Sequence, residues 1–95
     1  MTILRKKHLD FVEGFNGSLD DLARAIGRMR YDATAELFEK LADEFRRKAD
    51  DDAQRGRAQL SQQLSNAGSE LQYVRFRFEH IWKICESHMD DEEAG

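Results

Sequence analysis

Apolar residues recur every three or four positions along about half of this chain, and no proline interrupts them. The mean spacing of about 3.6 residues is the period of a straight α-helix, so these side chains stay on one stripe. The series consists of Phe38, Leu41, Phe45, Ala49, Ala53, Gly56, Leu60, Leu64, Ala67, Leu71, Val74, Phe78, Ile81 and Cys85. This pattern predicts an all-α fold dominated by long helices.

Two shorter amphipathic segments precede this series. The first helix is expected over residues 3–15. The second is expected to follow the sequence 18-SLDD-21 and to extend to about residue 30, because the Ser18 side chain can accept a hydrogen bond from the backbone of residue 21. Asp32 is a suitable cap for the next helix. We therefore expect two short N-terminal helices followed by a long helical hairpin or a coiled-coil-like rod.

The long segment contains two possible break points, at residues 50–56 and at residues 66–72. Gly68 suits a left-handed helix end and 69-SELQ-72 has the pattern of a capping box, so the second break is favoured. An unbroken rod would need a second chain to cover its stripe, and dimerisation through this stripe is expected to stabilise the protein. Residues 1–89 are expected to form one helical domain, and residues 90–95 an acidic flexible tail.

The composition excludes several functional classes. The chain has 95 residues and a formal net charge of −4, which disfavours a nucleic-acid partner because such binding depends on phosphate neutralisation. The single cysteine cannot form an intrachain disulfide and favours a reducing compartment. No run of apolar residues approaches the ~20 residues of a membrane span. A cytoplasmic location without membrane association is expected.

No motif in the sequence predicts catalysis, a cofactor or a metal. His80, Cys85 and His88 lack the paired spacing of a zinc site, and Cys85 fits the apolar stripe as a buried thiol. Ser87 stands beside His88, but neighbouring residues of a helix point in different directions. The sequence also lacks a glycine-rich phosphate loop after a strand. We expect a protein that is not an enzyme and needs neither metal nor cofactor.

A short string near the N-terminus, 22-LARAIG-27, resembles the first helix and turn of a helix-turn-helix motif. The resemblance implies DNA binding through residues 18–40, with Arg24, Arg28 and Arg30 near phosphates. Beyond this string the sequence departs from the motif, because 36-ELFEK-40 is acidic where a recognition helix is normally basic. Weak helix-turn-helix DNA binding is therefore the third hypothesis for function.

A row of carboxylates suggests a second hypothesis. Such a row can imitate a nucleic-acid backbone and occupy the basic groove of a nucleic-acid-binding machine, as small phage or mobile-element inhibitors do. Basic residues within the same stretch reduce the negative potential of this row. The alternative interpretation is therefore a solvated surface whose charges are paired with one another. The acidic residues are Glu36, Glu39, Asp43, Glu44, Asp50, Asp51 and Asp52.

The first hypothesis is based on aromatic residues that lie off the apolar stripe. On a helical wheel Tyr73, Phe76 and His80 group together, roughly opposite Val74 and Phe78. These residues are either covered by the N-terminal helices or available to another chain. Aromatic and arginine side chains dominate interface energetics, which favours helix-face docking. The expected partner-binding residues are Tyr73, Arg75, Phe76, Arg77, His80 and Trp82.

Together these observations predict a small helical protein-interaction module, either an adaptor or an inhibitor. Docking of a helix face onto an unidentified protein would be its mechanism, and a homodimer is expected. Self-association through the aromatic residues and capture of a different protein remain open alternatives at this point.

Overall fold

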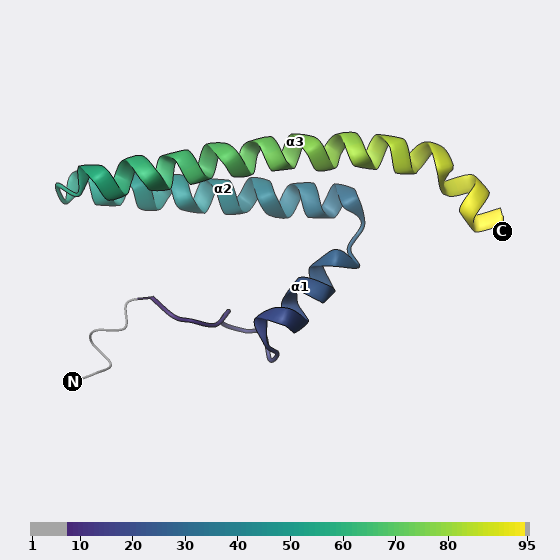
Figure 1. The fold of residues 1–95 in the computed structure, drawn as a ribbon, viewed down its shortest axis with the longest axis horizontal. Coiled ribbons are helices and arrows are strands. Elements are labelled where there is room, and N and C mark those ends of the chain that lie inside the picture. Colours follow the sequence, from purple (N-terminus) through teal and green to yellow (C-terminus); the bar gives the residue numbers. More distant parts are fainter. Residues whose placement is uncertain (1–7, 95) are drawn as a thin grey trace.

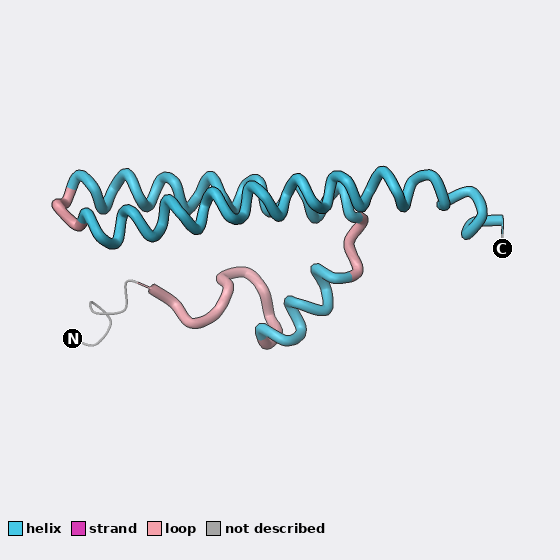
Figure 2. The backbone as a smooth tube through the Cα atoms, turned by 45° about the horizontal axis from the view of Figure 1, so that its top comes forward, coloured by secondary structure: helices cyan, strands magenta, loops and turns pink. Residues whose placement is uncertain are grey.

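The computed structural model describes residues 8–94, and the side chains of residues 8–88. The chain forms three helices, α1 (Leu19–Gly27), α2 (Tyr31–Gln54) and α3 (Ala58–Ala94). Helices α2 and α3 lie side by side in opposite directions, whereas α1 and the segment before it form an arm beside them (Figure 1). Throughout the described chain the backbone is either helix or loop (Figure 2), so the prediction of an all-α fold is confirmed.

A tight turn at residues 55–57 joins the two long helices into a hairpin. Gly56 adopts a φ of 78°, which a glycine accepts without steric cost. The backbone N–H of Arg57 donates to the Asp52 carbonyl over 2.8 Å, and the Arg57 side chain pairs with the Asp52 carboxylate at 3.2 Å. The predicted break at residues 66–72 is wrong, because α3 runs without interruption through Gly68.

Small residues form the line along which α2 and α3 touch, here called the seam. Ala35, Ala42 and Ala49, one heptad apart on α2, are all buried. On α3, the Ser61 hydroxyl donates to the Ala49 carbonyl over 2.7 Å. A β-carbon at Gly68 would lie 3.2 Å from the Ala42 carbonyl oxygen. Gly68 therefore serves close helix packing, and not the helix end that its sequence context suggests.

The two flanks of the seam differ in chemistry. On one flank, Arg46 donates to the Gln72 side chain over 3.2 Å, and the Arg75 guanidinium lies 3.6 Å from the Glu39 carboxylate. On the other flank the rings of Phe38 and Phe78 stack with centroids 5.5 Å apart, and further apolar residues extend this side. These pairings fix the register of the hairpin and make one flank polar and the other apolar.

The N-terminal region differs in part from expectation. Of the helix predicted over residues 3–15, residues 3–7 lie outside the described part, and residues 8–15 form turns and extended backbone. A helix of this length is marginal without packing, and Leu9, Phe11 and Val12 are largely exposed. The capping box of α1 is confirmed, since the Ser18 hydroxyl accepts from the Asp21 N–H over 3.1 Å.

The ends of the long helices also differ slightly from prediction. Helix α2 begins at Tyr31 after Arg30, so Asp32 lies within its first turn and does not precede it as a cap. Its carboxylate still accepts a hydrogen bond from the Ala33 N–H over 2.9 Å. Helix α3 continues to Ala94, well into the segment expected to be a flexible tail. Among residues 8–94, no helix has a stretch long and apolar enough to cross a membrane.

Replacing Gly68 by valine is expected to force the two helices apart. The added atoms would meet the α2 backbone at Ala42, which cannot move as a flexible side chain can. We expect the free energy of unfolding to fall by about 1–3 kcal/mol, the usual cost of overpacking. Urea denaturation followed by circular dichroism measures it. The control is Ser69→Val, on the exposed neighbouring residue, which should change stability by less than about 0.5 kcal/mol. Equal effects of the two substitutions would contradict close packing at Gly68.

Candidate functional site

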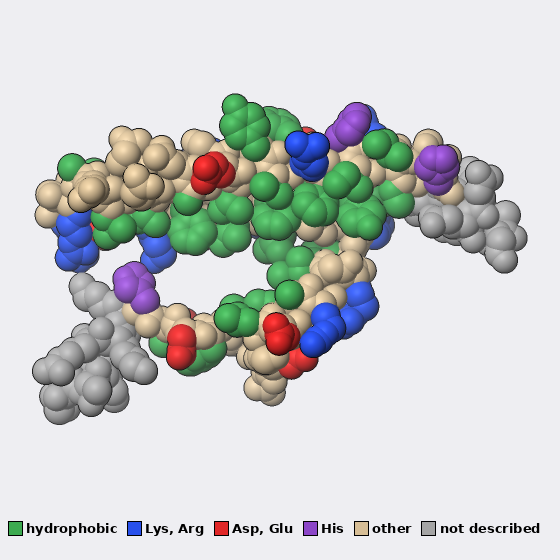
Figure 3. All heavy atoms as spheres, in the orientation of Figure 1, with side chains coloured by type: hydrophobic (Ala, Val, Ile, Leu, Met, Phe, Trp, Pro, Cys, Tyr) green, Lys and Arg blue, Asp and Glu red, His purple; other side chains and the backbone are tan. Residues whose placement is uncertain are grey.

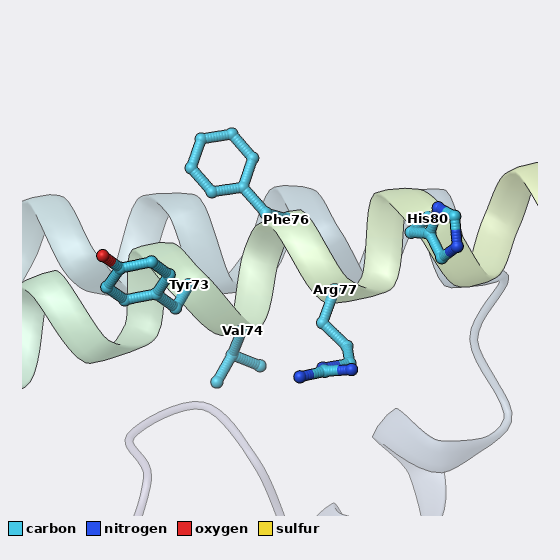
Figure 4. Close-up of a pocket in the computed structure, with 5 residues that line it drawn as sticks. All are labelled: Tyr73, Val74, Phe76, Arg77 and His80. Atoms are coloured by element: carbon cyan, nitrogen blue, oxygen red, sulfur yellow. The ribbon is translucent and has the colours of Figure 1, made fainter.

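An aromatic ridge, made of Tyr73, Phe76 and His80, projects from α3 into solvent. Together with Val74 and Arg77 these residues line a shallow pocket. In Figure 4, Val74 and Arg77 point toward the side on which the N-terminal arm lies, whereas Phe76 points away from it. Tyr73 is 75% exposed and Phe76 is 51% exposed. The arm therefore does not cover the ridge, and the alternative in which these aromatics belong to the intramolecular core is excluded.

Arg75 connects this ridge to the rest of the hairpin. Its Nη1 atom lies 2.8 Å from the Glu79 carboxylate and 3.6 Å from that of Glu39 on α2, and only 17% of its side chain is exposed. Its guanidinium carbon also lies 4.4 Å from the centroid of the Phe76 ring, a cation–π geometry. Arg75 is therefore a supporting residue that holds Phe76 in place, and its charge is largely turned inward.

Trp82 lies apart from the ridge, on the side of α3 that borders α2. The Arg30 guanidinium stacks 5.0 Å from the centroid of the indole ring. Trp82 and Arg75 line a groove together with carboxylates of both long helices, including Asp32 and Glu86. The six predicted partner-binding residues are thus divided. Tyr73, Phe76, Arg77 and His80 share one surface, and Arg75 and Trp82 share another.

The junction between arm and hairpin is held by an ion pair between Arg30 and Asp32. Two nitrogens of Arg30 donate to the two oxygens of Asp32, over 3.1 and 2.7 Å. This hydrogen bonding holds the pKa of the Asp32 carboxyl below its ordinary value, with a further contribution from the backbone N–H of Ala33. The same hydrogen bonds raise the pKa of Arg30. Because Arg30 also covers Trp82, the pair anchors the start of α2 on α3.

The anchoring by Asp32 is expected to be sensitive to acid. A carboxyl whose pKa is lowered on folding stabilises the folded state above its unfolded pKa of about 3.9, and this contribution is lost as the pH falls through the lower folded value. The carboxyl resonance of Asp32 in an NMR titration should accordingly report a pKa below the ordinary aspartate value of about 3.9. In Arg30→Gln, the Asp32 pKa should return toward its ordinary value. An Asp32 pKa that this substitution leaves unchanged would contradict the assigned cause.

The predicted acidic face is largely neutralised by neighbouring basic side chains. Six of its seven carboxylates form ion pairs, and Asp52 is only 8% exposed because it lies in the last turn of α2, against Arg57 of the hairpin turn. Asp50 is the member for which no ion pair is found among the described side chains. The pairs are Glu36–Lys40, Glu39–Arg75, Asp43–Arg46, Glu44–Arg47, Asp51–Arg55 and Asp52–Arg57.

The residues considered for chemistry do not converge on one another. Among the described side chains no cluster of three or more histidine, cysteine or carboxylate groups is close enough to hold a metal ion. The hydroxyl of Ser87 donates to the Ile84 carbonyl within its own helix, over 2.7 Å, and is not presented to His88. Helices α1 and α2 do not pack together as a helix-turn-helix pair, and the main helix packing is between α2 and α3.

A second surface, which the sequence assigned to a core, is the apolar flank of the hairpin. Eight of its ten residues are half-buried and two, Leu41 and Leu60, are exposed. No large apolar side chain among those described is fully buried. Figure 3 shows these hydrophobic side chains gathered on the side of the hairpin that faces the arm, with a hollow between the two. This surface, here called the apolar flank, consists of Phe38, Leu41, Phe45, Leu60, Leu64, Ala67, Leu71, Val74, Phe78 and Ile81.

Comparisons of this chain with protein-family models, with curated proteins and with solved structures found no match.

Proposed function

We propose that this chain is a small non-enzymatic protein-interaction module, an adaptor or an inhibitor, that acts by docking the aromatic ridge of α3 onto another protein. The observation that carries the proposal is the exposure of Tyr73 and Phe76 on a rigid helix. Isolated exposed apolar residues are common, but two neighbouring aromatic rings beside an arginine and a histidine are typical of a recognition surface. The module is expected to act as a homodimer.

The ridge suits docking for energetic reasons. Each aromatic side chain presents a large apolar area, and burying it at an interface commonly contributes about 2 kcal/mol or more. Arg75 restrains the Phe76 ring before binding, so less side-chain entropy is lost when a partner covers it. Arg77 and His80 border the rings and can supply polar contacts at the rim. A partner with an apolar groove and carboxylates at its edge has the complementary chemistry.

Truncation of the ridge is expected to abolish partner binding without unfolding the hairpin. Tyr73→Ala/Phe76→Ala removes the exposed rings, so affinity for the partner should fall at least about 100-fold. A photo-crosslinking residue at His80, used in a lysate of the source organism, should form an adduct that the double variant loses. The control is Leu19→Ala on α1, which also removes an exposed apolar side chain, but away from both the ridge and the long helices, and should keep the adduct.

Urea denaturation of the double variant supplies the second control, because a fully buried phenylalanine would cost 3–5 kcal/mol on truncation whereas the ridge should cost about 1 kcal/mol or less. The same adduct in wild type and in the double variant would refute docking through the ridge.

The nucleic-acid-mimicking inhibitor stays an alternative with less support, because its carboxylates are mostly paired with arginine and lysine. It predicts that a basic target is bound through the exposed acidic residues. Asp43→Asn/Asp50→Asn should then weaken binding of a basic nucleic-acid-binding protein, measured by titration calorimetry, and high salt should do the same. Asp52 is left intact in this test because it supports the turn. DNA binding through residues 18–40 has the least support, since α1 and α2 do not pack together.

A further inference from the structure

The chain exposes far more surface than a compact monomer of its size. Its accessible surface is 7901 Å², whereas a folded monomer of 11.1 kDa is expected to expose about 5,700 Å². Its radius of gyration is 17.3 Å, against an expected value of about 12.4 Å for one compact domain. A surplus of about 2,200 Å² follows from the difference of the two areas.

Large apolar side chains line one face of the hairpin. The seam buries only small side chains such as Ala42, so the large apolar residues are displaced to the apolar flank. Leu41 on α2 is 37% exposed and Leu60 on α3 is 48% exposed. The arm lies opposite this flank but leaves a hollow against it (Figure 3), and its own Leu19 is also largely exposed. The arm is therefore an incomplete cover.

We propose that a second copy of this chain covers the apolar flank. Two hairpins that meet face to face through this flank make a four-helix bundle, in which the large apolar residues of both copies form one shared core. The contact is isologous, because each copy presents the same surface to the other. The arm opens about the short linker of residues 28–30 to admit the second hairpin. Its packing against the hairpin is slight, so little is lost when it moves.

The chemistry of the apolar flank fits a second copy better than other occupants. The residues assigned to it are all uncharged. Arg77 points to the same side of α3 as Val74 but is exposed, so its long side chain can keep its charge in water at the edge of the interface. Obligate homodimers bury about 1,000 Å² or more per subunit and resemble a domain core cut in half. The surplus of about 2,200 Å² belongs to the whole chain, and it exceeds the area that each subunit of such a dimer buries.

A lipid surface would instead favour unpaired basic residues around the face. Near the turn Lys48, Arg55 and Arg57 do border it, but Arg55 and Arg57 are paired with the Asp51 and Asp52 carboxylates, so this edge is not a strongly basic rim.

This inference rests on the homodimer included in the proposed function, and it is independent of the aromatic ridge. Val74 and Phe76 point to opposite sides of α3 (Figure 4), so a bundle built on the flank covers Val74 at one edge of the ridge pocket but leaves the Phe76 ring free. Each dimer would then carry two ridges, one per copy. Failure of the ridge to bind a partner would leave the dimer unaffected.

The test is the solution mass of the full chain, measured by light scattering over a dilution series from millimolar to micromolar. Wild type should have twice the chain mass of 11.1 kDa at high concentration. Leu41→Lys/Leu60→Lys should have the single mass under the same conditions, because it places a charge from each helix in the interface. Both residues are more than a third exposed in the single chain, so the variant should keep its helical circular dichroism. Leu41→Gln/Leu60→Gln is a milder pair that serves the same purpose if the lysine variant loses helicity.

Ile84→Lys is the matched control, since Ile84 is 52% exposed but is not part of the apolar flank. It should remain dimeric, as should Tyr73→Ala/Phe76→Ala. A wild-type chain that is monomeric at every concentration would overturn the inference, as would a dimer that survives both substitutions at Leu41 and Leu60. A dimer that dissociates on loss of Tyr73 and Phe76 would also overturn it, and would move self-association to the ridge.

Discussion

The close approach of α2 and α3 depends on very small side chains at the positions where the two helices touch. Ala35, Ala42 and Ala49 meet Gly68 and Ser61 across the seam, and the backbones come near enough for a serine hydroxyl to reach a carbonyl of the opposite helix. Dispersion contacts between the two backbones replace those of a normal side-chain core. Because the seam has no room for large residues, every bulky apolar side chain is displaced to a flank. The asymmetry between the two flanks of the hairpin follows from this one constraint.

The polar flank and the aromatic ridge are coupled through Arg75. Its guanidinium reaches Glu39 on the neighbouring helix and Glu79 on its own helix, while its plane supports the Phe76 ring. Arg75 therefore both holds the hairpin together and positions Phe76, whose ring is exposed to solvent. Substitution of Arg75 would therefore change the ridge and the hairpin at once, which makes it a poor probe of either alone. Tyr73 makes fewer such contacts with the hairpin, so a substitution of Tyr73 tests the ridge more directly.

The sequence predicted the fold class and the α1 cap correctly, because both depend on local periodicity and on one hydroxyl. It misplaced the hairpin turn because Gly68 satisfies two physical demands. The same glycine suits a left-handed helix end and a close helix crossing, and only the partner helix decides between them. The sequence around Gly56 predicts a helix end less strongly than that around Gly68, but Gly56 is the residue that adopts a positive φ at the turn. The six predicted partner-binding residues lie on two different surfaces for a similar reason. A helical wheel groups Tyr73, Phe76 and His80, but it cannot show that α2 lies against Arg75 and Trp82.

The three-residue turn around Gly56 also sets the order in which the hairpin can form. Contacts close to the turn, such as Arg57 with Asp52, join residues that are near in the chain, whereas Glu39 and Arg75 are separated by much more of it. Loop-closure entropy therefore rises steadily away from the turn, and pairing is expected to progress from the turn outward like a zipper. In this order the end that contains Tyr31, Phe78 and the root of the arm closes last. That end is also the first to open during fluctuations of the folded chain.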